Sequence, residues 1–491
     1  MTKKTNDYDL IVIGAGGAGL AAAVTAAEAG CSVLVIESED KIGGSTGLSQ
    51  GVFTAAGTSL QKALGYEDSV DAFYDYYMTL NHWKLPASVV RAFCENAGPT
   101  MDWLISLGVT YPHKLAHKPK NAVWPCASDG PGLYASGVEY PPRGHMPEGN
   151  GAAYITVLDE RRAVLGVDLV LKTRVQKLLV EGGRVVGVET AGQQIRSAAV
   201  AVTCGGFGQD RDMIRKYFPH AYEGVPEGAH PVTISAPGSR GDALRMAEDI
   251  GAWIWGINCG LLNTRPWIVR RPGMPPSLGT QPASLIYVNR EGRRFVDETA
   301  PYAVMPTIIK AQGEVVWGVF DEDTRLSSGA LTNAATSAGA SWAPDFILER
   351  VKMGDFQAGN SLEELARNCG ITNAKALENA VANYNTDLPT GRDREFLREL
   401  DGLRPIAKAP FYAFQYRACD INLSGAGMRI DAATHVLDNN GDIIPGLFAA
   451  GEAGAGVLGE RYVGGGNSVA NALTMGRLAG RTIAGECARG G

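Results

Sequence analysis

The chain has no pair of cysteines spaced to hold a metal or a cluster. Its eight cysteines are scattered, and none forms a CxxC pair. Structural zinc sites, iron–sulfur clusters and c-type haem attachment use such close spacings, so the sequence argues against all three. We therefore expect most of these cysteines to be small buried apolar residues and predict no metal.

The sequence also lacks a long basic run and a signal-like apolar segment. Its formal net charge is −7 over 491 residues, which argues against nucleic acid as a partner. The start, MTKKTNDYDL, has two lysines but no apolar signal region, and the first apolar stretch runs directly into glycines. We expect a cytoplasmic protein with no membrane span, long enough for two domains.

A strand, a glycine-rich turn and an Ala-rich helix open the chain. The apolar strand Leu10–Ile13 leads into Gly14, Gly16 and Gly19, which have GxGxxG spacing. In such a motif the first glycine allows a tight turn, the second lets backbone N–H groups approach a pyrophosphate, and the third lets the helix pack on the strand. The next strand delivers Glu37 where a carboxylate would hold ribose hydroxyls, so a dinucleotide is predicted.

Three later segments favour FAD as that dinucleotide. Residues 41–51 form a second glycine-rich turn, too soon after Glu37 to belong to another Rossmann unit. Residues 168–206 read as a β-meander with a hairpin at 181–184 that ends in a glycine pair, as in large flavoproteins. Residues 446–452 repeat the pattern of a strand followed by an acid, and Glu452 would bind the ribitol chain.

A helix expected to start near Asn467 would direct its positive N-terminal end at the N1/O2 edge of the flavin. Negative charge accumulates at that edge on reduction, so the helix dipole would stabilise the reduced cofactor.

With GRRFVDETAPY (292–302), SGAGMRID (424–431) and GGGNSVANALTMGRLAG (464–480), these segments resemble the succinate dehydrogenase/fumarate reductase flavoprotein superfamily over nearly the whole chain. The resemblance implies an α/β fold: a Rossmann-like FAD-binding domain of the glutathione-reductase type, with a β-meander, plus an α+β cap domain. We expect the FAD-binding domain at 1–230 and 405–491, with a helical and loop-rich insertion at about 67–149, and the catalytic cap at 231–404.

The same patterns define the expected cofactor-binding residues. They are Gly14, Gly16, Ala18, Gly19, Glu37, Ser38, Gly44, Ser45, Thr46, Gly51, Val175, Gly205, Glu452, Ser468 and Val469. Ser45 stands where covalent flavoproteins of the superfamily carry histidine, so the resemblance predicts non-covalent FAD.

Residues that bind dicarboxylates in the superfamily are largely replaced here. Tyr302 occupies the place of the proton-donating arginine of fumarate reductases, Leu423 replaces a histidine, and Trp255–Leu261 contains no histidine. Only Arg461 remains as a carboxylate clamp, and only if its loop shifts. Two carboxylates need several cationic donors to offset their desolvation, so we expect an uncharged substrate.

The replacements resemble 3-ketosteroid dehydrogenases, whose motifs read N-E-S-x-P-Y and Y-P-G-P-G. The resemblance implies that the Tyr462 hydroxyl and the Gly466 N–H bind a ketone oxygen, and that Tyr302 removes an α-proton. Such a proton leaves only if enolate charge is stabilised as it forms, which two donors at the oxygen would provide. The β-hydrogen would leave as hydride to flavin N5 and give an enone.

The substrate is expected to be a small apolar ketone, and electrons would pass to an external acceptor. Val463 and Gly465 replace the two prolines of the ketosteroid pattern, and the chain is short for a steroid enzyme. A 3-ketosteroid and a smaller oxocyclohexane-type ketone therefore both remain open. A soluble fumarate-reductase-like enoate reductase and a non-catalytic electron-transfer subunit are the alternatives.

Tyr302 needs a neighbour to act as a base, because an unperturbed phenol has a pKa of about 10. A second hydroxyl from Tyr111, Tyr134 or Tyr140, with Tyr111 or Tyr140 preferred, or the cation of Arg461, would favour the phenolate. The sequence does not choose between them. His145 is a further candidate for the flavin's surroundings, because the corresponding family loop lies there.

Overall fold

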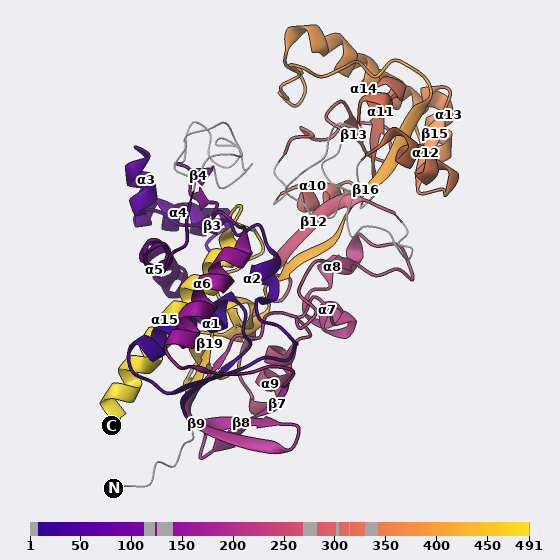
Figure 1. Ribbon diagram of the computed structural model, residues 1–491. Coiled ribbons are helices and arrows are strands. Elements are labelled where there is room, and N and C mark those ends of the chain that lie inside the picture. The colour runs from indigo at the N-terminus through magenta and orange to yellow at the C-terminus, as the bar shows by residue number, and fades with distance from the viewer. Residues whose placement is uncertain are drawn as a thin grey trace. The chain divides into compact units, whose positions relative to one another are not determined.

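The computed structural model comprises two compact units (Figure 1). One contains residues 1–219, 233–261 and 421–491, and the other contains 220–232 and 262–420. The residues that the structure describes are 8–111, 123–124, 141–268, 282–300, 304–313, 315–328 and 342–490. This division does not test the expected catalytic role of residues 231–404, so the cap domain remains a prediction.

The first unit is built on an eight-stranded sheet with the order β18-β19-β9-β1-β2-β6, to which β8 and β7 are added beside β9. Strands β19, β9, β1, β2 and β6 pair in parallel. The sheet strands are β1 (Tyr8–Ile13), β2 (Val33–Ile36), β6 (Asp168–Val170), β7 (Val175–Glu181), β8 (Arg184–Thr190), β9 (Gln193–Val202), β18 (His435–Leu437) and β19 (Ile443–Ala449). Apolar runs such as VLVI of β2 fit strands that are buried on both faces.

The predicted β-meander is confirmed. Strands β7 and β8 form a hairpin in which Glu181 pairs with Arg184, and β8 then pairs antiparallel with β9. Because β9 returns to the centre of the parallel sheet, its end at Val202 lies beside Ile13, the end of β1. The glycine pair after β9 is therefore brought to the dinucleotide turn.

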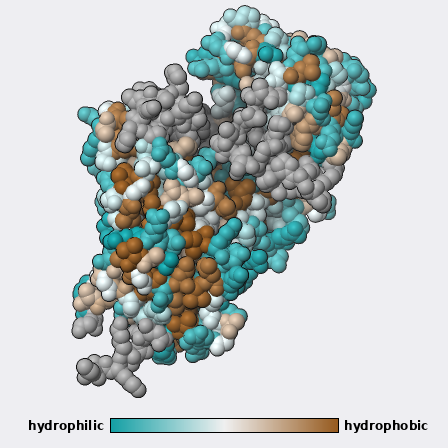
Figure 2. Space-filling model, viewed as in Figure 1, coloured by the Kyte–Doolittle hydropathy of each residue, from teal (hydrophilic) through white to brown (hydrophobic). Residues whose placement is uncertain are grey.

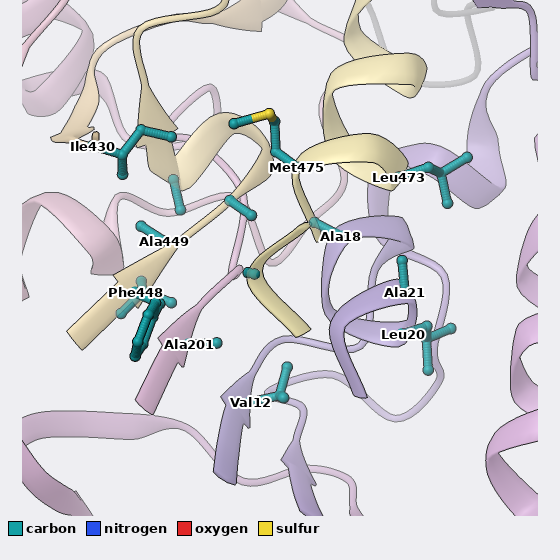
Figure 3. Close-up of a cluster of buried hydrophobic side chains, with 14 of the residues drawn as sticks. Val12, Ala18, Leu20, Ala21, Ala201, Ile430, Phe448, Ala449, Leu473 and Met475 are labelled. Carbon is teal, nitrogen blue, oxygen red and sulfur yellow. The ribbon is translucent and has the colours of Figure 1, made fainter. Parts of the chain in front are cut away.

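Two helices cross very closely on this sheet: α1 (Gly17–Glu28) and α15 (Asn467–Gly490). A Cβ on Gly476 would lie 2.8 Å from the carbonyl carbon of Ala18, and one on Gly480 would lie 2.5 Å from the oxygen of Ala22. Figure 3 shows Ala18 of α1 close below Met475 of α15, within the cluster of buried apolar side chains. The C-terminal helix is thus seated on the helix that follows the dinucleotide turn.

Helices and short strands of the insertion complete this unit. The long helices are α4 (Val70–Leu80) and α5 (Ala87–Ser106), and the small sheet has the order β3-β5-β4. The remaining elements are α2 (Gly44–Leu48), β3 (Phe53–Thr54), α3 (Ser59–Ala63), β4 (Val123–Trp124), β5 (Gly144–His145), α6 (Gly151–Val164), α7 (Arg211–Tyr217), α9 (Asp242–Ile250), β11 (Ile254–Trp255), β17 (Gly427–Arg429), η3 (Gly451–Ala453) and β20 (Gly454–Ala455).

The second unit combines a six-stranded sheet with several helices. In this sheet β16 pairs with β10, β12, β14 and β15, and β13 pairs with β14. The strands of this sheet are β10 (Val232–Thr233), β12 (Gly260–Pro266), β13 (Ile286–Val288), β14 (Val316–Phe320), β15 (Phe356–Gly359) and β16 (Phe411–Ser424); one end of β10, β12 and β16 falls within the residue ranges of the first unit. Its helices are α8 (His220–Glu223), α10 (Met305–Ala311), α11 (Glu322–Ser327), α12 (Pro344–Lys352), α13 (Leu362–Cys369), α14 (Ala374–Asp387) and η2 (Leu388–Thr390).

Apolar side chains also reach the surface. Val164 is 77% exposed and Leu48 is 63% exposed. On the face shown in Figure 2, brown apolar residues lie among teal polar ones. Within the described part of the chain, no helix combines the length and the apolar character that a membrane crossing would require.

Candidate functional site

The dinucleotide turn has the geometry that its glycines require. Gly14 has a φ of +102°, and a Cβ there would lie 2.8 Å from the Cα of Cys204. A Cβ on Gly19 would lie 2.7 Å from the Thr203 hydroxyl, so the helix starts pressed against the end of β9. Larger residues at these positions would push the turn off the sheet edge.

Glu37 directs its carboxylate at this turn. The Ala15 N–H donates to Oε2 (2.7 Å), and the Glu39 N–H donates to Oε1 (2.9 Å). The Ser38 hydroxyl donates to the same Oε1 (3.2 Å). The carboxylate therefore sits at the edge of the sheet between the ends of β1 and β2, where a ribose would bind.

The second glycine-rich turn lies directly beside the first. The Gly43 N–H donates to the Ala15 oxygen (2.9 Å), and Gly16 forms a parallel bridge with Gly43. Thr46 packs so closely on Gly17 that a Cβ at 17 would lie 2.6 Å from its hydroxyl. The Ser45 hydroxyl accepts from the Ala236 N–H (3.1 Å). Two turns separated by a strand and helix thus form one continuous cradle.

Farther along this turn, Gly51 has a φ of +77°, and a Cβ there would meet the backbone of Asn150 at 2.5 Å. Val175 begins β7 and is 5% exposed. It lines an open depression of about 850 Å³ whose other walls include four arginines and two aspartates. Among these, Arg174 pairs with Asp242, and Arg245 pairs with Asp210.

Glu452 is held where three distant segments meet. Its Oε1 accepts from the Ser424 N–H (3.0 Å) and its Oε2 from the Gly206 N–H (3.2 Å), next to Gly205. Burial raises the pKa of this carboxyl to about 7, since no described cation pairs with it. Among the described residues this buried carboxylate has two backbone donors, so it suits a ligand that brings hydroxyls, as a ribitol chain does.

The loop before α15 brings Tyr462 to the start of that helix. The Ser468 N–H donates to the Tyr462 hydroxyl (3.1 Å), and the two hydroxyls lie 3.1 Å apart. Tyr462 is 8% exposed and Val469 is 6% exposed. Gly466 has a φ of +99°, and a Cβ there would lie 2.6 Å from the Val52 oxygen. Tyr462, Gly466 and Ser468 therefore form one cluster at the positive end of α15.

Of the other predicted catalytic tyrosines, the structure describes only Tyr111. Tyr302 and Tyr140 lie outside the described residues. The Tyr111 hydroxyl lies 3.0 Å from that of Tyr154, which donates to the Gly51 oxygen (2.8 Å). Burial raises the pKa of Tyr111 well above its usual value. Its described contacts therefore favour a neutral phenol.

His145 is fully buried in the insertion. Its Nδ1 lies 3.0 Å from the Phe53 oxygen and its Nε2 lies 2.9 Å from the Thr58 hydroxyl. Burial lowers its pKa to about 4. With one ring nitrogen donating and the other accepting, the neutral imidazole is fully hydrogen-bonded, which identifies a structural histidine.

Sequence reasoning missed Tyr77 and Asn81, which contact the loop that carries Tyr462. The Tyr77 hydroxyl donates to the Val457 oxygen (2.7 Å), and Asn81 Oδ1 accepts from the Arg461 N–H (3.1 Å). A buried tyrosine on an amphipathic helix reads as core in any sequence pattern. The partners lie more than 370 residues away along the chain, so no local signal marked them.

Comparison with known proteins identifies the family. The model of the FAD binding domain family matches residues 9–469. The chain belongs to this family. The family model confirms the expected cofactor, FAD, and the α/β fold. Together with the similar reductases and dehydrogenases named below, it confirms the superfamily and the enzyme class, an FAD-dependent oxidoreductase acting on CH–CH bonds. Glycine turns shaped for close backbone approach, with Glu37 and Glu452 at the strand ends, fit this cofactor.

Three relatives cover nearly all of the chain. Urocanate reductase of Eggerthella lenta is 30% identical over 493 residues, which is 98% of this chain and 75% of that protein. The 4-oxocyclohexanecarboxylate 2-dehydrogenase of Sinomonas cyclohexanicum is 27% identical over 570 residues, 98% of this chain and 93% of that one. The solved 3-ketosteroid-Δ4-(5α)-dehydrogenase of Rhodococcus jostii has a TM-score of 0.78 and 25% identity, and covers 98% of each chain.

Proposed function

We propose that this protein catalyses the α,β-dehydrogenation of a small cyclic ketone, or the reverse reduction of the enone. The observation that carries the proposal is the Tyr462 hydroxyl beside the first turn of α15, in one loop with Gly466. Two relatives are named for ring ketones, a 4-oxocyclohexanecarboxylate and a 3-ketosteroid. Those names support a ketone substrate here and leave the ring size open.

Tyr462 is suited to hold a ketone oxygen. Its hydroxyl accepts from the Ser468 N–H, and a phenol that accepts one hydrogen bond becomes a stronger donor in the next. With the Gly466 N–H it would supply two neutral donors to the oxygen. Neutral donors match an uncharged carbonyl and stabilise the enolate charge that develops when the α-proton leaves.

We assign the removal of the α-proton to Tyr302, with help from Tyr140, Tyr111 or Arg461. Arg461 adjoins Tyr462 and is the cation of that loop. FAD, when bound, accepts the hydride from the β-carbon or returns it in the reverse direction. We further propose that Ser45 leaves the cofactor non-covalent and that an external acceptor takes the electrons.

An enoate reductase is the second candidate. Urocanate reductase is among the relatives, and the Asn467-Ser468 continuation of the loop is closer to fumarate reductases than to ketosteroid enzymes. In that reading Arg461 would bind a substrate carboxylate. The ketone is favoured because Tyr302 and Leu423 stand where the resembling dicarboxylate enzymes carry an arginine and a histidine, and two carboxylates need several cationic donors.

One anaerobic experiment separates the candidates. The purified yellow protein is mixed with cyclic ketones, steroids and fumarate-like acids, and flavin bleaching is recorded; the dithionite-reduced protein is then mixed with the unsaturated partners. The proposal is supported if ketones bleach the flavin and the rate of bleaching is about 10²-fold lower in Tyr462→Phe. Removing one oxyanion donor lowers a rate by about that factor. The control is Tyr74→Phe, because Tyr74 packs on Trp83 and Arg91.

The other outcomes reject the ketone reading. Reoxidation by unsaturated acids alone indicates an enoate reductase. A flavin that responds to no substrate indicates an electron-transfer subunit.

A further inference from the structure

The loop that carries Tyr462 has little rigidity of its own. It connects β20 to α15 through residues 456–466, which form neither helix nor strand. Five of these eleven residues are glycines, and Gly456, Gly464 and Gly466 have positive φ. Glycine backbones lose the most conformational freedom on folding, so contacts from outside the loop must hold it in one shape.

Tyr77 of α4 holds both ends of this loop. Its hydroxyl donates to the Val457 oxygen (2.7 Å), and the Asn467 Nδ2 donates to the same hydroxyl (2.9 Å). A phenol has a single proton, so giving it to Val457 leaves the oxygen to accept from Asn467. One buried hydroxyl thus connects the start of the loop to the first residue of α15.

Asn81, the residue directly after the end of α4, contacts the middle of the loop. Its Oδ1 accepts from the Arg461 N–H (3.1 Å), and its Nδ2 donates to the Tyr77 backbone oxygen (3.2 Å). A Cβ on Gly459 would lie 2.9 Å from the Asn81 Cγ, so the loop backbone lies flat on this side chain. Tyr462 is the residue directly after the Arg461 contact.

The support beneath these two side chains is rigid. The Tyr77 ring packs edge-on against Phe73 (5.9 Å between centroids) and Phe93 (5.7 Å). At the start of α4, Arg143 forms a buried two-point ion pair with Asp68, at 2.8 Å for each contact. The helix therefore presents Tyr77 and Asn81 from a packed core and not from a mobile surface.

We propose that Tyr77 and Asn81 are positioning residues that fix the 456–466 loop, and with it the Tyr462 hydroxyl and the start of α15, at the flavin. The inference rests on the proposed role of Tyr462. Neither residue touches the reacting atoms, so both act through the loop. The insertion that carries α4 is thereby part of the catalytic apparatus of the fold.

The test compares Tyr77→Phe with Tyr74→Phe, which removes a hydroxyl from the same helix away from the loop. We expect Tyr77→Phe to keep one FAD per chain. For a cyclic ketone that bleaches the wild-type flavin, kcat should fall about 10-fold or more and KM should change less than threefold. Small misplacements of catalytic groups cost up to ~10²-fold. The midpoint potential of the bound FAD should also fall, because a shifted α15 start stabilises the reduced flavin less. If kcat or the potential matches that of Tyr74→Phe, the proposal is wrong.

Asn81 gives an independent pair of variants. Asn81→Ala removes both of its hydrogen bonds, whereas Asn81→Asp keeps the acceptor for the Arg461 N–H. We expect the first to reproduce the effects of Tyr77→Phe and the second to recover part of the kcat, because the aspartate keeps this acceptor but sets its other oxygen against the Tyr77 backbone oxygen. Equal loss in both would show that a general packing defect, and not loop placement, is responsible.

A double variant distinguishes this proposal from the proposed function. If Tyr77 acts through Tyr462, adding Tyr77→Phe to Tyr462→Phe lowers kcat by less than twofold. If Tyr77→Phe instead lowers kcat by the same factor in the wild type and in Tyr462→Phe, Tyr77 does not act through Tyr462. If Tyr462→Phe alone turns over ketones at the wild-type rate, the proposed function fails. A fall in potential in Tyr77→Phe would then still report the positioning of α15.

Discussion

The contact between α1 and α15 offers a sharp test of how the cofactor cradle is supported. In Gly476→Ala the new Cβ would lie 2.8 Å from both the Cα and the carbonyl carbon of Ala18, well inside normal contact. Both partners are backbone in packed helices, so neither can rotate away as a side chain would. Overpacking of this kind costs about 3 kcal/mol at the upper end of its range.

Gly485→Ala is the matched control on the same helix. A Cβ at position 485 would meet only the far end of Arg489, at 3.9 Å. Alanine there should stabilise the helix by about 1 kcal/mol, because glycine is a poor helix former. The two substitutions add the same methyl group to one helix and share this gain, so their effects on unfolding free energy should differ by the overpacking cost, about 3 kcal/mol.

Urea unfolding of the FAD-loaded protein, followed by flavin fluorescence, measures this difference. Gly476→Ala should also bind FAD more weakly, since a displaced α1 moves the turn at Gly14–Gly19. The reasoning is refuted if Gly476→Ala unfolds at the same urea concentration as Gly485→Ala, or if it binds FAD as tightly as the wild type.

Three further predictions concern buried groups and the cofactor. Because burial lowers the pKa of His145 from 6.5 to about 4, the unfolded chain binds more protons than the folded chain between these pH values. The free energy of unfolding should therefore drop by about 3 kcal/mol as the pH falls from 6.5 to 4. Urea unfolding of the apoprotein should show a shallower pH dependence in His145→Gln than in the wild type, and equal slopes would contradict this. Glu452→Gln should weaken FAD binding by ~10-fold or more in a fluorescence titration, because charge-assisted hydrogen bonds to ribitol hydroxyls are lost; an unchanged Kd would remove Glu452 from the cofactor site. Acid precipitation should release all FAD into the supernatant because Ser45 cannot form the covalent link, and flavin that stays with the denatured chain would disprove non-covalent binding.

The dinucleotide turn could be predicted because its determinants are local. Gly14, Gly16 and Gly19 follow an apolar strand, and Glu37 ends the next one, so adjacent residues specify both shape and position. The hairpin at 181–184 is local in the same sense. Steric limits on φ and the apolar runs of buried strands act over a few residues, so both can be recognised in a single sequence.

The grouping of Glu452 with Gly206 and Ser424, and the support of the Tyr462 loop by Tyr77 and Asn81, depended on tertiary structure alone. Their members are separated by tens to hundreds of residues. Each looks ordinary in its own segment, because a buried tyrosine or asparagine has the same local pattern whether it fills a core or holds a loop. Such contacts arise only when parallel strand ends and packed helices bring remote segments to one edge of the sheet, and no spacing rule in the chain encodes that meeting.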